Sequence, residues 1–306
     1  MSKHHWLALV SLPGVGGATG RKLLERFGGI EAAFDAPDAA LAAVPRLNAG
    51  LVARLRMISL EAIEAELAAL ADEGLSVLTW DDADYPANLR PLPDAPPALF
   101  VRGDLRPGDA GAVAIIGTRE PTAAGVAAAE ALARGLAGLG LTVVSGLAIG
   151  IDTAAHRGAL AAAGGRTLAV PGSGLRAIHP RQNAALAEGI ARRGALLSEL
   201  HPNTPPSGPA LMARDRIVSG LARAVIVIEA GEKSGSLDTA AKARRQGRLL
   251  LALPGSPGTD RLLAEGAGRL APNGTDFAAL ARRIRGHELP GDEERGRGAR
   301  QPCLWG

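Results

Sequence analysis

Residues 112–156 constrain the fold more than any other stretch of this 306-residue chain. They begin with an unbroken apolar run at 112–116, which is typical of a strand buried on both faces of a sheet. A glycine-containing turn at 117–119 and an Ala- and Leu-rich helical segment follow, and a second strand at 141–144 leads to a second such turn at 145–146. Such turns bring backbone N–H groups and helix N-termini to one edge of a parallel sheet. That edge favours anions, above all phosphate.

The alternation of strands and helices continues along most of the chain. Apolar strands are expected at 76–80, 98–101, 166–170, 195–197, 224–228 and 249–253, and helices at 183–191, from about 214, and at 237–246. This order predicts an α/β fold with a doubly wound, mostly parallel sheet.

Two domains and a tail are expected. Residues 1–70 form a small all-helical domain, and residues 71–285 form the α/β domain. Within the first, residues 6–29 resemble a helix-hairpin-helix, whose Gly14-Val15-Gly16 turn either presents N–H groups to a nucleic-acid phosphate or only packs within a helical bundle. The tail at 286–306 mixes Arg, Gly, Glu and Pro and is expected to lack fixed structure.

The composition excludes several classes of protein. Hydrophobic residues make up 47% of the chain, enough for a packed core, but aromatic residues only 3%. The single cysteine, Cys303, allows no disulfide framework within the chain, which fits a reducing compartment. The apolar stretch at 6–12 is too short to span a membrane, so a cytoplasmic protein is expected. A net charge of +3 does not by itself identify a nucleic-acid binder.

Four predicted turns share one character, because each follows an apolar strand and is rich in Gly, Ser or Thr. They are Gly117-Thr118-Arg119, Ser145-Gly146, Gly172-Ser173-Gly174 and Ser234-Gly235-Ser236. Glycine allows a ligand close to the backbone, and the hydroxyl groups add hydrogen-bond donors. With Arg119 in the first turn, the four together predict a phosphate-binding edge of the sheet.

Common nucleotide and hydrolase motifs are missing. No G-x-x-x-x-G-K-[ST] loop occurs, and the turn at 172–174 lacks the third glycine of a dinucleotide site, so no nucleotide cofactor is expected. Asp152 and His156 share one helix face near Ser145, but no G-x-S-x-G elbow is present, so we interpret the Asp–His pair as structural. The pair also has too few partners to bind a metal ion. No catalytic residue and no metal ligand is therefore predicted.

Several charged residues beside these turns are open to two interpretations. Arg181, Arg214 and Arg216 are either phosphate ligands or ordinary surface arginines of an Arg-rich chain. Glu199 and Glu229 follow strands and are either general bases or buried carboxylates paired with Arg214 or Arg216.

A series of short motifs, in order along residues 80–267, resembles the DNA-processing protein A family, also called DprA or Smf. The motifs are YPANL at 85–89, ALFVRG at 98–103, IIGTR at 115–119, SGLAIGIDTAAHRGAL at 145–160, GGRTLAVPGSGL at 164–175, HPRQN at 179–183, LLSE at 196–199, RDRIVSGLA at 214–222, VIEA at 227–230 and SGSLDTA at 234–240. The helical N-terminal segment is also similar to that of the family.

The resemblance implies an extended Rossmann-like fold that binds single-stranded DNA, forms a homodimer and helps to load the RecA recombinase during natural transformation. It implies no enzymatic activity and no cofactor. By matched position, it implies phosphate contacts for Arg119 and Arg181, and it places Ser145-Gly146 and the Arg214/Arg216 region around the same pocket. The expected nucleic-acid-binding residues are Gly117, Thr118, Arg119, Ser145, Gly146, Arg181, Asn183, Arg214, Arg216, Ser234, Gly235 and Ser236.

The chain departs from the family pattern at several positions. Leu211-Met212 replaces Phe-Pro, and Asp215 replaces an Asn between two arginines, where a carboxylate offsets part of their charge. We therefore expect weaker DNA binding or arginines committed to structural ion pairs. His179 replaces a Tyr, which predicts a weak pH dependence of binding. No winged-helix domain is expected after residue 285.

Two other functions are compatible with a phosphate-binding sheet edge. One is a nucleotide phosphoribohydrolase of the lysine-decarboxylase-like, cytokinin-activating type, whose Pro-Gly-Gly-x-Gly-Thr signature is echoed at 171–174 and at 234–236. The other is a carrier of a small phosphorylated molecule. Release of a base from a nucleoside monophosphate would identify the first, and stabilisation by mononucleotides the second.

Overall fold

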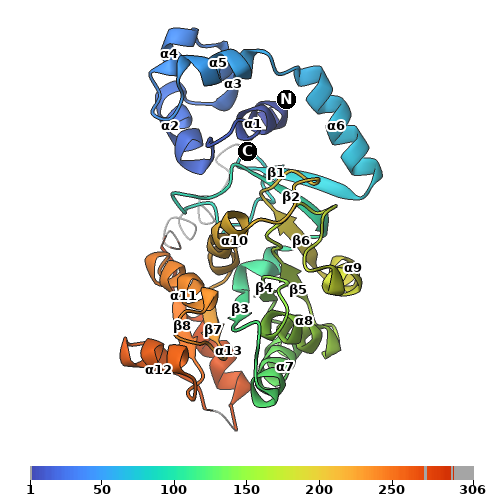
Figure 1. The fold of residues 1–306 in the computed structure, drawn as a ribbon, viewed down its shortest axis with the longest axis vertical. Coiled ribbons are helices and arrows are strands. Elements are labelled where there is room, and N and C mark those ends of the chain that lie inside the picture. Colours follow the sequence, from blue (N-terminus) through green and yellow to red (C-terminus); the bar gives the residue numbers. More distant parts are fainter. Residues whose placement is uncertain (1, 272–273, 291, 293–306) are drawn as a thin grey trace, which may run out of the picture.

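The computed structural model describes residues 2–271, 274–290 and 292, and Figure 1 shows their fold. A nine-stranded sheet forms its centre. The strands are β1 (Leu75–Thr79), β2 (Ala98–Gly103), β3 (Val113–Ile116), β4 (Val143–Ser145), β5 (Thr167–Ala169), β6 (Ala195–Ser198), β7 (Ala224–Val227), β8 (Leu249–Ala252) and β9 (Gly268–Arg269). They lie in the order β1-β2-β6-β5-β4-β3-β7-β8-β9. Strands β3 to β9 pair in parallel, whereas β1 and β2 pair antiparallel, which confirms the predicted α/β fold.

Helices precede the sheet and cover both of its faces. They are α1 (Ser2–Val10), α2 (Gly17–Phe27), α3 (Ile30–Asp35), α4 (Asp38–Ala42), α5 (Ala49–Arg56), α6 (Leu60–Asp72), α7 (Ala123–Gly138), α8 (Ile151–Ala161), α9 (Ala184–Arg193), α10 (Gly208–Leu221), α11 (Gly235–Arg245), α12 (Pro257–Ala264) and α13 (Phe277–Arg285), with 3-10 turns η1 (Pro107–Gly111) and η2 (Arg181–Asn183). Within the described ranges, none of the helices combines the length and apolarity that a membrane span requires.

Alternate residues of the central strand β3 enter two separate cores. Val113 and Ile115 pack in the core that α7, α8 and α13 cover. Ala114 and Ile116 pack on the opposite face, in the core that also receives α10, α11 and the N-terminal helices. All four side chains are at most 4% exposed, as an unbroken apolar strand in a doubly wound sheet requires.

Small residues allow the helices on one face to approach closely. Helices α7 and α8 lie side by side (Figure 1), and a Cβ atom at Gly158 would overlap the backbone of Glu130. The abundance of Ala and Gly in this region therefore serves close packing of helices against each other and against the sheet.

The connections from the sheet reverse direction at β3. Strand β3 has β4 on one side and β7 on the other, so the chain leaves the ends of β3 and β7 toward opposite halves of the sheet. In open α/β sheets, ligands bind in the crevice that such a reversal leaves at the carboxyl ends of the strands. The topology alone thus points to the turns after β3 and β7.

The N-terminal helices share a core with the α/β part. Trp6 packs edge-on against Trp80 with ring centroids 5.1 Å apart, and its indole N–H donates to Asp81 at 2.6 Å. Helix α6 ends at Asp72, close to the expected boundary at residue 70. The division into domains stays a prediction, as does DNA contact by the turn at Gly14, which is exposed with φ +75°.

Helix α10 begins at Gly208, several residues before the expected start near 214. The Ser207 side chain accepts from the Ala210 N–H, and Pro209 occupies the first turn. Ser followed by Gly-Pro is thus a helix start here, whereas the proline-rich sequence before it suggested a longer loop. Helices α12 and α13 and strand β9 were not predicted.

The predicted unstructured tail begins too early. Leu289 is 4% exposed, and Arg223 donates to the His287 carbonyl at 2.6 Å and pairs with Asp292 at 3.1 Å. Residues 286–290 and 292 therefore pack on the α/β part. The other residues of the predicted tail, including Cys303, lie outside the described residues.

Candidate nucleic-acid interface

A cavity of about 490 Å³ lies where the sheet connections reverse. Three of the four predicted turns line it: Gly117 to Arg119 after β3, Gly146 and Ala148 after β4, and Gly231 with Lys233 to Ser236 between β7 and α11. Leu211, Met212, Arg214 and Asp215 of α10 complete the wall. Distant parts of the sequence thus meet at the sheet edge that the pattern predicted.

The fourth turn, 172–174, does not reach the cavity. Its residues are buried, because Gly172 packs under Leu211 and Gly174 packs against the backbone of Pro202. The prediction that four turns form one open edge is therefore wrong for this turn. Tertiary packing by α10 and the segment before it covers the turn, and a local sequence pattern does not record such packing.

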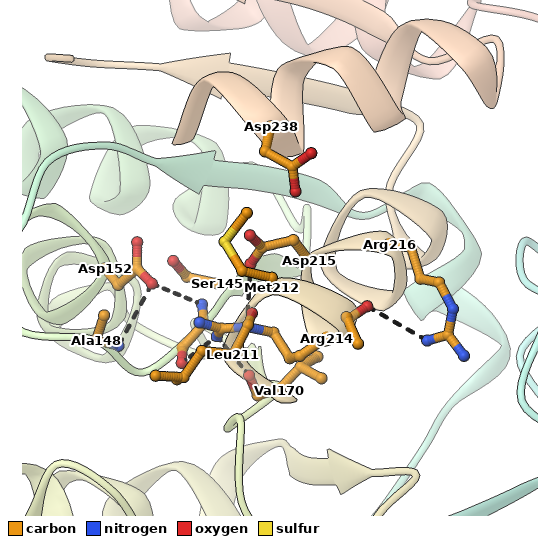
Figure 2. A network of polar contacts seen from close by, with 12 residues as sticks. Ser145, Ala148, Asp152, Val170, Leu211, Met212, Arg214, Asp215, Arg216 and Asp238 are labelled. Carbon is orange, nitrogen blue, oxygen red and sulfur yellow. Dashed lines mark hydrogen bonds and ion pairs between the residues drawn. The ribbon is translucent and has the colours of Figure 1, made fainter. Parts of the chain in front are cut away.

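Arg214 is a buried connector within this wall. It is 6% exposed, its guanidinium donates to the carbonyl groups of Gly146 and Val170, and it pairs with Asp215 at 3.1 Å (Figure 2). A Cβ atom at Gly146 would overlap this guanidinium, so only glycine fits there. Arg214 thereby fastens the turns after β4 and β5 to α10.

The turn after β4 already holds a carboxylate of the chain itself. Asp152 accepts hydrogen bonds from the N–H groups of Gly146 at 3.1 Å and Ala148 at 3.4 Å (Figure 2). Burial raises the pKa of Asp152, while the Arg214 charge and the two N–H donors act in the opposite direction. The N–H groups that were expected to receive a phosphate are therefore occupied.

The N-terminus of α7 is occupied in the same way. Glu229, at the end of β7, accepts from the Thr122 hydroxyl at 2.9 Å and from its N–H at 3.1 Å. Glu229 thus caps the helix that the first glycine turn introduces, where a carboxylate also interacts favourably with the helix dipole. The predicted pairing of Glu229 with Arg214 or Arg216 is therefore wrong, because this half-buried carboxylate binds Thr122 instead.

The turn before α11 differs, because its backbone faces open space. Cβ atoms placed at Gly231 and Gly235 would meet no neighbour within 4 Å. Ser234 caps α11, and Lys233 beside it is exposed and lines the cavity. Sequence reasoning missed Lys233, although a lysine inside a Gly/Ser turn that follows an apolar strand was a usable signal.

Exposed cations line this cavity and two neighbouring ones. Arg119 lines the main cavity and also a smaller one of about 220 Å³ that includes His179. His179 and Arg181 then line a third cavity of about 670 Å³. In the part of the chain that the structure describes, none of Lys233, Arg119 and Arg181 forms an ion pair. The first and second cavities share several lining residues, the second and third share His179, and we call the three together the cationic groove.

Three of the expected site residues line none of these cavities. Ser145 is buried and donates to the Ile115 carbonyl at 2.7 Å, and the Asn183 amide donates to the Leu147 carbonyl at 2.8 Å. Arg216 binds both oxygens of Glu199, at 2.8 and 2.6 Å, so Glu199 is its structural partner. The other nine expected residues line the cationic groove, and DNA contact by each of them stays a prediction.

His156 packs in the interior next to this wall. The Thr167 hydroxyl donates to the Val143 carbonyl, so its oxygen accepts from His156 Nδ1 at 2.7 Å. Burial, with a smaller contribution from Arg214, lowers the pKa of His156 to about 3 and keeps the ring neutral. Ser145 donates elsewhere, so these residues do not form a hydrolase triad.

Asp215 lines the main cavity as a partly buried carboxylate. Burial raises its pKa to about 6, the charges of Arg214 and Lys242 lower it, and the charge of Asp152 raises it further. An acidic group in the wall of a predicted anion site is the clearest departure of this groove from a simple cationic surface.

Comparison with known sequences gives one family. The sequence profile described as DNA recombination-mediator protein A matches residues 76–281. The DNA processing protein DprA of Bacillus subtilis is 41% identical over 191 residues, which are 62% of this chain and 64% of that protein. The present chain thus corresponds to less than two thirds of the length of this relative.

Solved structures of two related proteins are similar in fold. DNA processing protein A from Streptococcus pneumoniae superimposes with a TM-score of 0.76 at 33% identity, over 87% of this chain and 94% of that one. DNA processing protein A from Helicobacter pylori, described for its single-stranded DNA binding mode, gives a TM-score of 0.61 at 32% identity, over 69% of this chain and 95% of that one.

Proposed function

This chain belongs to the DNA recombination-mediator protein A family, and on that basis we propose that it binds single-stranded DNA and acts as a recombination mediator. The observation that carries the proposal is a set of three exposed cations, Lys233, Arg119 and Arg181, which form no ion pair with another described residue and line cavities at the carboxyl edge of the sheet. The DNA-binding mode described for the Helicobacter pylori relative supports the same assignment.

The groove would hold the strand through its phosphates. Arginine and lysine side chains and open backbone N–H groups contact phosphate oxygens without reading the bases. The three cations would neutralise phosphates along the strand, while the exposed Gly231 and Gly235 leave space for the strand to approach the backbone. Binding is therefore expected to tolerate any sequence and to weaken steeply with salt.

The finer aspects of the role are also proposed. We infer that the protein forms a homodimer in the cytoplasm, protects incoming DNA during natural transformation and helps to load RecA, as family membership suggests. We further infer that it does so without catalysis. Light scattering of the purified protein tests the dimer, and RecA filament growth on DNA coated with single-strand-binding protein tests the loading.

Binding to oligo(dT) tests the proposal. Arg119→Ala is expected to weaken binding at low salt and to lower the slope of log affinity against log salt by about 0.7, the share of one phosphate contact. Arg134→Ala is the matched control, because Arg134 is also an exposed arginine but lies on α7 and lines none of the three cavities. Equal binding by wild type and Arg119→Ala at every salt concentration would contradict the proposal.

The phosphoribohydrolase alternative loses part of its support. The turn at 172–174, one of the two segments that echoed the signature of those enzymes, is buried under α10 and lines none of the three cavities of the groove. Incubation with nucleoside monophosphates is expected to release no free base, and release of a base would reinstate the enzyme.

A further inference from the structure

The buried part of the groove wall contains more negative than positive charge, although the exposed Arg119 and Lys233 make the main cavity as a whole cationic. Asp152 and Asp215 both lie beside Arg214, the one buried guanidinium that links the turns to α10. Lys242 is also near Asp215, but it pairs with Asp238 four residues earlier on α11 and donates to the Met212 carbonyl. When both carboxylates are ionised, this cluster therefore carries one uncompensated negative charge.

Asp215 is the member of the cluster that meets a bound strand. It lines the main cavity together with Arg119 and Lys233, whereas Asp152 is held by two backbone N–H groups. In Figure 2 Asp215 lies between Asp238 above and Arg214 below. A phosphate placed in the cavity would thus lie close to a carboxylate in a partly desolvated wall, where like charges repel strongly.

Resting on the proposed function, we propose that single-stranded DNA binding is coupled to uptake of a proton by Asp215, so that the groove binds DNA more tightly as the pH falls. The coupling is reciprocal: the factor by which a bound anion raises the proton affinity of Asp215 equals the factor by which the bound proton raises the affinity for the anion. Protonation removes the uncompensated charge and turns Asp215 into a neutral hydrogen-bonding group. The coupling acts through charge alone and requires no change in the contacts between the protein and the bases of the DNA.

The groups around Asp215 favour this coupling in the neutral pH range. Burial raises the pKa of Asp215 to about 6 even before an anion binds. It faces Arg214 of its own helix, Asp152 of α8, and Lys242, Asp238 and Thr239 of α11. A phosphate in the cavity adds a further negative charge and moves the pKa of Asp215 upward, toward the pH at which binding is measured.

Two histidines, one buried and one in the groove, are the other groups to consider for the pH dependence of DNA binding. His156 stays neutral, because its pKa is lowered to about 3. His179 is exposed and lines the groove, and the pH dependence that the sequence predicts for it is measured separately with the variant His179→Gln.

The test is oligo(dT) affinity at about pH 5.5 and about pH 7.5 at one salt concentration, with wild type, Asp215→Asn and His179→Gln. Wild type is expected to bind about tenfold more tightly at the lower pH. Asp215→Asn should bind at pH 7.5 as tightly as wild type does at pH 5.5, and its remaining pH dependence should be only that which His179→Gln removes from wild type. Calorimetry in two buffers of different ionisation heat should show uptake of roughly half to one proton near pH 7 for wild type and less for Asp215→Asn.

Glu232→Gln serves as the charge control. Glu232 is an exposed carboxylate in the turn before α11 and is not part of the buried cluster. Its loss removes one negative charge near the groove, and the pH dependence of binding is expected to persist. Binding of equal strength at both pH values in wild type, or an unchanged pH dependence in Asp215→Asn, would overturn the coupling while leaving DNA binding intact. Absence of binding at both pH values would instead contradict the proposed function, and the coupling with it.

Discussion

Arg119 and Arg214 are chemically identical, but burial gives them opposite roles. Arg119 is exposed at the end of the first glycine turn and forms no ion pair with any described residue. Arg214 is 6% exposed and fully engaged with two carbonyl groups and Asp215. The first is available to a ligand, and the second holds the turns in place.

This contrast predicts different costs of truncation. Arg214→Ala should lower the free energy of unfolding by about 3–5 kcal/mol, because it leaves Asp152 and Asp215 without their buried counter-charge. Arg119→Ala should change it by no more than about 0.5 kcal/mol. Urea denaturation of both variants measures the difference, and similar midpoints for the two would show that Arg214 is not a structural residue.

Asp215 predicts a pH dependence of stability with a definite sign. Its pKa is raised from 3.8 to about 6 in the folded state, so between these values the unfolded chain has released the proton that the folded chain retains. The free energy of unfolding therefore falls as the pH rises from about 4 to about 6, and it stays lower by the full amount at higher pH. Asp215→Asn should raise the free energy of unfolding at about pH 8 by up to about 3 kcal/mol and change it little at about pH 4. A variant that is less stable than wild type at pH 8 would contradict this assignment.

The sequence indicated which residues gather at the groove but not which way they face. The Gly117–Arg119 turn and the Ser234–Ser236 turn could be predicted, because strand ends and glycine spacing are local properties. Ser145 and Asn183 could not, since their hydrogen bonds to Ile115 and Leu147 depend on parts of the chain about 30 or more residues away.

At the scale of elements, two of the helices that begin at the groove already have a carboxylate of the chain at their N-termini. Glu229 fills the N-terminus of α7, and Asp152 fills the turn before α8. The start of α11, with its exposed Gly235 and Lys233, is capped by the Ser234 side chain, and among the described residues it donates no hydrogen bond to a carboxylate. A helix start in a parallel sheet therefore binds an external phosphate only when the chain has not supplied its own anion.

Glu229→Gln tests this interpretation. The free energy of unfolding should fall by about 1 kcal/mol, because an amide interacts less favourably with the N–H groups and dipole of α7. Affinity for oligo(dT) should not fall, since the substitution removes a negative charge from the sheet edge. A variant that loses affinity for DNA without losing stability would show that Glu229 takes part in DNA binding, which contradicts the interpretation.

The pattern of elements could be predicted for the central sheet and less well outside it. Strands β3 to β8 are short, apolar and bounded by turns, and each lies within about two residues of its expected range. The predicted start of α10 was too far along the chain, because the proline-rich sequence before the helix suggested a loop although Ser207 caps its N-terminus. Helix α12 begins with Pro257-Gly258, which obscures its helical period. Helix α13 contains neither glycine nor proline, and the apolar spacing of Phe277–Arg285 was a usable signal that the sequence analysis missed.

At the scale of the whole molecule, a nearly neutral protein presents a local cationic surface. The net charge is only +3, and twelve ion pairs of Lys or Arg with Asp or Glu neutralise many of the charged side chains among the described residues. The unpaired cations of the groove lie where the sheet connections reverse, so position rather than total charge accounts for the site. With aromatic residues at 3%, stacking of many bases on aromatic rings contributes little.

The central claim is that the three cations of the groove bind successive phosphates of one strand. The most direct test is the salt dependence of oligo(dT) affinity for wild type and for a variant in which Arg119, Arg181 and Lys233 are all replaced by alanine. The account predicts that the slope of log affinity against log salt becomes shallower by about 2, three contacts at about 0.7 each. A slope that stays the same in a folded triple variant would show that the strand binds elsewhere.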